Sequence, residues 1–292
     1  MGILQVLSNG IVTGSLYALI ACGFSLIYST NKFIHFAHGI SVVIASYLFY
    51  YFMALLGIPL SLAVILTVLL SALVGVLMYK IIYLPLQKRK ASNVILLIAS
   101  LGILILCQNL IQIIFGTNIK TVDSSFSTSL NLLGIEVTLL QVIIVLTSLV
   151  ILALLYFFMK KTSLGRNIRA VSNNKELASI IGIDPQRIAS LTFLIGSAIA
   201  GIAGVLLALE SIIEPTMGTN LMIRGFTGAI VGGLGSVPAS ILGSYILGVL
   251  ENLGVYAFSS SYKDAITFII LFLFLLLKPN GLFGFSKGVK NV

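Results

Sequence analysis

Charged residues are scarce in this sequence: they make up only 9% of its 292 residues, whereas soluble domains typically carry about 25%. Hydrophobic residues account for 59% of the chain, and the mean hydropathy is +1.15. A shortage of charge on this scale excludes an ordinary soluble domain. The composition therefore indicates an integral membrane protein.

Cysteine is also rare, and common catalytic motifs are missing. The two cysteines, Cys22 and Cys107, lie far apart, which excludes a disulfide framework and a cysteine metal site. The chain contains neither a G-x-x-x-x-G-K-[ST] phosphate loop nor an H-E-x-x-H zinc motif. His35 and His38, with scattered acids, do not form a convergent catalytic set. We therefore expect no enzyme activity, catalytic residue, metal or cofactor in this chain.

Long hydrophobic runs dominate the sequence. A transmembrane helix needs roughly 20 apolar residues, and runs of about that length occur at 8–28, 38–56, 61–84, 93–115, 138–159, 190–212, 238–257 and 264–278. A shorter run lies at 221–235. The pattern predicts an all-α, polytopic helical bundle with eight or nine membrane segments, in one domain over residues 1–292.

The net charge of +9 does not indicate nucleic acid, because the positive charge is concentrated in three short loops. Four of the 17 basic residues lie at 80–90, six at 160–187 and three at 278–290. The positive-inside rule places these loops in the cytoplasm. Counting spans then places the N-terminus outside and the C-terminus inside, provided that 221–235 crosses the membrane. The 116–137 connection would face outside.

Two stretches interrupt the apolar pattern and predict broken helices. Residues 29–39 place two histidines between membrane segments, and residues 225–235 contain five glycines ahead of Pro238. Irregular backbone at membrane depth survives only when it is buried in protein or lines a wet cavity, and transporters use paired breaks. The candidate pathway residues are His38, Gly39, Gly232, Gly233, Gly235 and Ser236.

Close helix packing is the alternative explanation for the glycines, as at Gly228-x-x-x-Gly232. For the spacing Gly196-x-x-x-Ala200-x-x-x-Gly204, packing is the preferred interpretation. Ionisable groups in spans are functional candidates by default. We expect Glu210 or Glu214 to pair with Arg224 at the outer mouth, and leave open whether Glu251 reaches the membrane interface.

A polar insert at about 160–189 separates two spans. Asn173 stands three residues before Glu176, as in a capping box, and Leu177, Ile180 and Ile181 then form an apolar edge at helical spacing. Gly182 is a natural helix stop, and Asp184-Pro185 supplies a new N-cap and N1 proline. The pattern predicts a short cytoplasmic helix whose apolar edge lies on the membrane, under its own spans or in a partner's groove.

Several stretches resemble a known family. Glu176 to Gly182, "ELASIIG", is similar to the E-A-A-x-x-x-G loop of bacterial ABC importer permeases, although Leu177 replaces the central alanine. The stretches "FAHG" at 36–39 and "GGLGSVPASILG" at 232–243 look like the branched-chain amino acid permeases of the LivH type. The resemblance covers about residues 10–280. Urea and short-amide permeases share much of this pattern.

The resemblance implies a permease subunit in a bacterial cytoplasmic membrane, importing branched-chain amino acids with energy from ATP. It implies as partners two ABC ATPase subunits, a second, homologous and non-identical permease, an extracytoplasmic substrate-binding protein, and membrane lipid. It assigns the coupling helix to Glu176, Leu177, Ala178, Ile180, Ile181 and Gly182. The alternatives are a urea or short-amide permease and, less favoured, an ion-coupled secondary transporter with Glu251 as its coupling acid.

Overall fold

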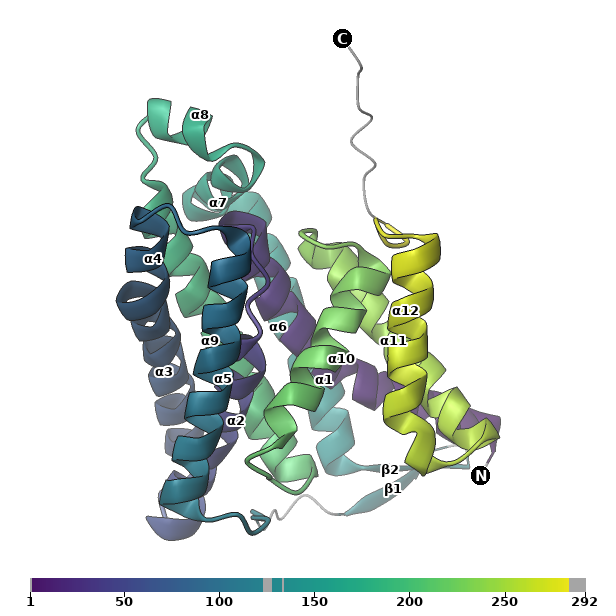
Figure 1. Ribbon diagram of the computed structural model, residues 1–292. Helices are drawn as coiled ribbons and strands as arrows, with labels where there is room; N and C mark the ends of the chain where they lie inside the picture. Colours follow the sequence, from purple (N-terminus) through teal and green to yellow (C-terminus); the bar gives the residue numbers. More distant parts are fainter. Residues whose placement is uncertain (1, 123–127, 133, 284–292) are drawn as a thin grey trace.

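The computed structural model describes residues 2–122, 128–132 and 134–283, and its helices form a membrane bundle around α1 (Ile3–Asn31) (Figure 1). α1 packs against α6 (Leu139–Lys161), α9 (Pro185–Glu210), α10 (Met217–Gly232) and α11 (Val237–Ala257). α2 (Ala37–Tyr50) packs against α9 and α10. Most residues of α1 and α9 are buried, so these helices form the protein-facing centre of the bundle.

The outer helices are α3 (Leu60–Met78), α5 (Asn93–Phe115), α6 and α12 (Lys263–Leu277). Large apolar side chains cover their exposed faces, including Leu69, Ile113 and Phe272. In a membrane such faces contact lipid chains, so their exposure has no hydrophobic penalty. Short π-helical turns extend two helices: η1 (Tyr51–Leu55) continues α2, and η2 (Tyr79–Tyr83) joins α3 to α4 (Leu84–Lys88).

The expected membrane segments are confirmed. Within the described residues, eight helices are long and apolar enough to cross a membrane. α10 has only 16 residues and is not among them. The chain nevertheless enters α10 beside a Lys120–Ile213 bridge near the end of α5, and leaves it beside the end of α6. α10 therefore joins opposite ends of the bundle, as Figure 1 shows.

A small β-hairpin was not predicted from the sequence. β1 (Ser129–Leu132) and β2 (Ile135–Thr138) pair antiparallel in the 116–137 connection and just beyond it. Gly134, with φ +83°, donates its N–H to Asn131 Oδ1 at 3.1 Å. The Gln5 amide both donates to and accepts from the backbone of Glu136 at 2.8 Å, which ties the hairpin to the start of α1.

Both predicted interruptions are present. Residues 32–36 separate α1 from α2, and residues 233–236 separate α10 from α11. Gly233 and Gly235 have φ values of +137° and +85°, in the region that side chains disfavour. The break at 232–238 is therefore confirmed, and it depends on glycine at two positions.

The packing interpretation of 196–204 is also confirmed. A Cβ added to Gly196 would lie 3.0 Å from the Gly23 carbonyl oxygen of α1, and one added to Gly204 would lie 2.7 Å from Ala45 Cβ of α2. These glycines let α9 approach both neighbours closely, as small residues do in membrane bundles.

We predict that Gly204→Leu lowers the free energy of unfolding by about 1–3 kcal/mol, because overpacking forces α9 away from α2. Gly102→Leu in α5 is the matched control, since a Cβ there meets nothing within 4 Å. Both substitutions raise helix propensity equally, so thermal unfolding in detergent isolates the packing effect. Equal melting temperatures for the two variants would contradict the close α2–α9 contact.

Candidate coupling and translocation site

The polar insert contains two helices that stand beyond one end of the bundle, α7 (Ser163–Asn173) and α8 (Lys175–Ile180) (Figure 1). The predicted cap residue was wrong by one position. Asn173 ends α7, and the Asn174 side chain caps α8 by accepting hydrogen bonds from the Glu176 and Leu177 N–H groups at 2.9 and 3.0 Å. Asn174 is extended, at φ −153°, which gives the sharp corner between the helices.

The end of α8 matches the sequence prediction. The Gly182 N–H donates to the Ser179 carbonyl and the Ile183 N–H to the Ala178 carbonyl, both at 3.0 Å, which closes the helix in a Schellman arrangement. Gly182 has φ +85°. Asp184 Oδ1 then accepts from the Gln186 N–H at 2.9 Å and so caps α9, whose first residue is Pro185.

The apolar edge of α8 is exposed. Leu177, Ile180 and Ile181 are 61%, 79% and 72% exposed, whereas Ala178 is 2% exposed and faces the protein. Lys175, at the start of α8, has a lowered pKa, first because it is partly desolvated and second because Lys32 at the end of α1 is nearby. α8 is thus held by caps and by one small buried residue, with three large apolar side chains left uncovered.

A cavity of about 510 Å³ lies at the same end of the bundle. Its wall combines residues from the end of α1, the last turns of α6, α7 and the 233–236 break. Gly235 and Ser236, two of the predicted pathway residues, line it beside Arg169 and Ser172 of α7. The structure therefore brings the break next to the polar insert.

The other predicted pathway residues lie elsewhere. His38 is fully buried, and a Cβ on Gly23 would lie 2.8 Å from its Nε2, so the glycine makes room for the imidazole. Gly39 packs against α10 near Met222, and Gly232 packs against the start of α11. These residues and Gly233 do not line the 510 Å³ cavity. Their pathway role stays a prediction.

A cluster of aromatic rings connects the two interruptions. Phe226 of α10 lies 6.0 Å from Phe36 and 5.8 Å from Phe24, measured between ring centroids. Phe24 stacks on Tyr28 at 6.1 Å, and Tyr28 lies against Gly235. The segment before α2 and the break before α11 therefore share one packed surface on α1.

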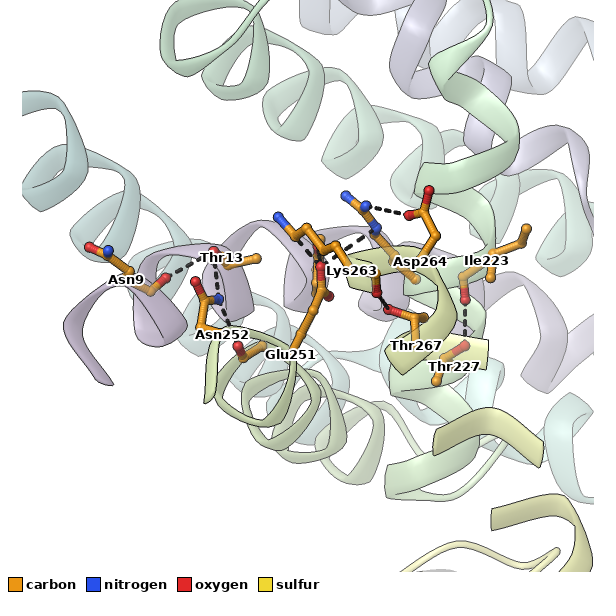
Figure 2. A network of polar contacts seen from close by, with 12 residues as sticks. Asn9, Thr13, Ile223, Thr227, Glu251, Asn252, Lys263, Asp264 and Thr267 are labelled. Atoms are coloured by element: carbon orange, nitrogen blue, oxygen red, sulfur yellow. Dashed lines mark hydrogen bonds and ion pairs between the residues drawn. The ribbon is translucent and has the colours of Figure 1, made fainter. Parts of the chain in front are cut away.

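Four charged side chains form a network around the buried Glu251, toward the opposite end of α11 (Figure 2). Glu251 has no exposed surface, and its Oε1 accepts from the Tyr17 hydroxyl at 3.1 Å and lies 3.4 Å from Lys263 Nζ. Arg224 lies 3.9 Å from Glu251 Oε1 and 2.8 Å from Asp264 Oδ1. Two acids and two cations thus neutralise one another where α1, α10, α11 and α12 meet.

This network corrects the expected pairing of Arg224 with Glu210 or Glu214, because Glu210 instead accepts from Gln141 Nε2 at 3.0 Å. Glu251 is buried within the protein. Sequence reasoning missed Tyr17, Lys263 and Asp264. A polar Lys-Asp pair at the start of an apolar helix was the available signal, but its partner in α10 is 40 residues away. Sequence reasoning also missed Tyr83, whose hydroxyl hydrogen-bonds His35 Nδ1 at 2.9 Å.

Comparison with known proteins matches residues 6–275 to the family described as "Branched-chain amino acid transport system / permease component". The chain is 33% identical to the high-affinity branched-chain amino acid permease BraD of Pseudomonas aeruginosa and 34% identical to LivH of Escherichia coli, with 96% of this chain and 95% of each relative covered. The probable LivH of Methanocaldococcus jannaschii is 32% identical, over 97% of this chain and 93% of the relative.

Among solved structures, the chain is similar to "PsaBC from Streptococcus pneumoniae in complex with Fab", with a TM-score of 0.52. The two are 15% identical, and the match covers 96% of this chain and 93% of the other. At that identity the similarity concerns the fold alone.

We predict that Asn174→Ala speeds hydrogen exchange of the α8 amides about fivefold, because losing an N-cap costs about 1 kcal/mol. Asn173→Ala is the control, since that residue ends α7 and does not cap α8. Exchange measured by mass spectrometry on peptides covering 174–182 separates the two variants. Faster exchange in Asn173→Ala alone would restore the cap position predicted from the sequence.

We also predict that Glu251→Gln destabilises the fold by about 1–3 kcal/mol, because Arg224 and Lys263, whose side chains are 19% and 35% exposed, lose the buried acid that they share. Asp264→Asn should cost at most about 1 kcal/mol, because the Asp264 side chain is 55% exposed and its pair is screened by solvent. Denaturant unfolding of the two variants tests this order. Similar stabilities would show that the network contributes little to the fold.

Proposed function

The chain belongs to the family of branched-chain amino acid permease components, and we propose that it is the permease subunit of an ABC importer that carries these amino acids across the cytoplasmic membrane. The observation that supports this best is α8: a short, doubly capped helix between two spans, with Leu177, Ile180 and Ile181 uncovered. A helix of six residues would be marginal alone. Its exposed edge suits the groove of a partner protein.

We assign that partner as an ABC ATPase, two copies of which would drive transport. The chain has no phosphate loop of its own, so ATP hydrolysis falls to separate subunits. The coupling residues are Glu176, Leu177, Ala178, Ile180, Ile181 and Gly182. A second permease, homologous and non-identical, would complete the membrane part, and an extracytoplasmic binding protein would deliver substrate.

The positive-inside rule supports an orientation with the α7–α8 end in the cytoplasm, because the basic loops at 80–90 and 160–187 lie at that end. The start of α1 then lies outside with the β-hairpin, and the end of α12 lies inside. This orientation requires α10 to carry the chain across the membrane. The course of α10 supports this, because it runs from the β-hairpin end of the bundle to the α7 end.

Coupling runs through α9. Closure of the ATPase dimer moves α8, and the Asp184 cap begins α9 only four residues after α8 ends. α9 packs on α1, α2 and α3. A displacement of its first turn therefore tilts the centre of the bundle and changes the side of the membrane from which the pathway is accessible. Shifting the bundle between two access states from 1:99 to 99:1 requires that the partner bind one state more tightly than the other by about 5.5 kcal/mol.

Gly235 and Ser236 are the pathway residues closest to this machinery, because the 233–236 break lies beside α7. The remaining pathway residues are His38, Gly39, Gly232 and Gly233. They belong with the first two because the aromatic cluster on α1 connects the segment before α2 to the 233–236 break. A buried Glu251 paired with two cations is a poor coupling acid, which weakens the ion-driven alternative.

The test is uptake into vesicles that contain the chain with its ATPase and permease partners. We predict that Ile180→Gln reduces ATP-dependent leucine uptake at least tenfold and weakens ATPase co-purification, because an apolar contact is lost. Leu164→Gln is the matched control: it removes an exposed apolar side chain from α7, outside α8. Uptake of urea instead of leucine would reassign the substrate. Uptake by the chain alone, driven by an ion gradient, would overturn the proposal.

A further inference from the structure

The 510 Å³ cavity has two chemically different halves. Its apolar half consists of Leu152, Leu155 and Met159 of α6 with Ile241 of α11. Its polar half includes Lys160, Arg169, Ser172 and Ser236. The volume lies in the range of about 300–1,000 Å³ that is typical of small-molecule sites.

The cavity exists because α6 and α11 both pack on α1, which contributes Ser29 to the wall between them. The position of Tyr156 indicates how deep in the membrane the opening of the cavity lies. This side chain is 46% exposed, and Lys160 Nζ donates to its hydroxyl at 3.2 Å. Tyrosine and lysine side chains at the last turn of an apolar helix are typical of the boundary between hydrocarbon and headgroups. The polar half therefore lies at headgroup depth, with the apolar half below it.

The electrostatics of the cavity favour an anion. Lys160 and Arg169 line it, and none of the acidic residues in the described part of the chain does. α11 begins at the cavity wall, and its N-cap Ser236 makes no side-chain cap. The partial positive charge of that helix end adds to the two cations.

We infer that this cavity binds an anionic phospholipid, whose phosphate contacts Lys160 and Arg169 and whose acyl chains lie along the apolar half. Basic pockets between membrane helices at the headgroup level have this chemistry. A bound headgroup would join α6 and α7 to the 233–236 break. The lipid would thus brace the segment that leads into α8.

Native mass spectrometry of the full-length chain, titrated with phosphatidylglycerol or phosphatidylcholine, tests the inference. We predict selective phosphatidylglycerol binding that weakens about 10- to 30-fold in the double variant Lys160→Gln, Arg169→Gln, as expected for two lost phosphate contacts. The matched control is Lys161→Gln, Arg166→Gln, which removes the same charge from exposed positions of the same helices outside the cavity. Its affinity should equal that of the unaltered chain.

A second variant, Ile241→Trp, fills the apolar half and leaves both cations in place; it should also weaken phosphatidylglycerol binding. Inorganic phosphate should not displace the lipid, since the apolar half provides part of the affinity. Equal losses of phosphatidylglycerol affinity in the Lys160→Gln, Arg169→Gln variant and the Lys161→Gln, Arg166→Gln control would show general attraction of the lipid to basic loops and overturn the inference. Displacement by inorganic phosphate, or loss of the lipid when the chain is assembled with its partners, would overturn it as well.

Discussion

Close backbone contact along α1 is the constraint on which the rest of the structure depends. Added Cβ atoms at Gly10 and Gly14 would lie 2.9 and 3.0 Å from Cα atoms of α11, and one at Gly23 would lie 2.8 Å from the Gly196 carbonyl oxygen of α9. Lipid chains are as apolar as leucine, so membrane helices associate through such close packing and not through the hydrophobic effect. The glycines of α1 thereby fix the positions of both neighbours.

The irregular and charged parts of the molecule are stable because they pack against this central helix. Tyr28 of α1 lies against Gly235 in the break, and Tyr17 of α1 donates its hydroxyl to Glu251 in the ion network. Irregular backbone and ionised groups at membrane depth each cost several kcal/mol when they contact lipid. Because α1 contacts both, one packed helix supports a broken segment near its end and the Glu251–Arg224 pair at its middle.

The sequence predicted most of the fold, since hydrophobic length specifies spans directly and a run of glycines shortly before a proline specifies a break. It also predicted α8 and its Gly182 stop, because capping chemistry is local. The exact cap was missed: Asn173 and Asn174 are chemically identical, and only the backbone conformation distinguishes them. The ion network was missed because Arg224 and Asp264 meet through tertiary packing. The roles of His38 and Gly39 could not be decided locally either, because His38 is buried against α1 and Gly39 against α10.

These constraints also limit how the bundle can move. Backbone contacts such as Gly23 to Gly196 cannot slide far without steric clash, so α1 and α9 would shift together as a rigid pair. The parts free to respond are held by few contacts: α8 is anchored through Ala178 and its caps, and α12 is largely exposed. A displacement of α8 by a partner would therefore pass to α9 and α1 together. The 233–236 break packs on α1 through Tyr28, so a movement of α1 would also reach this segment.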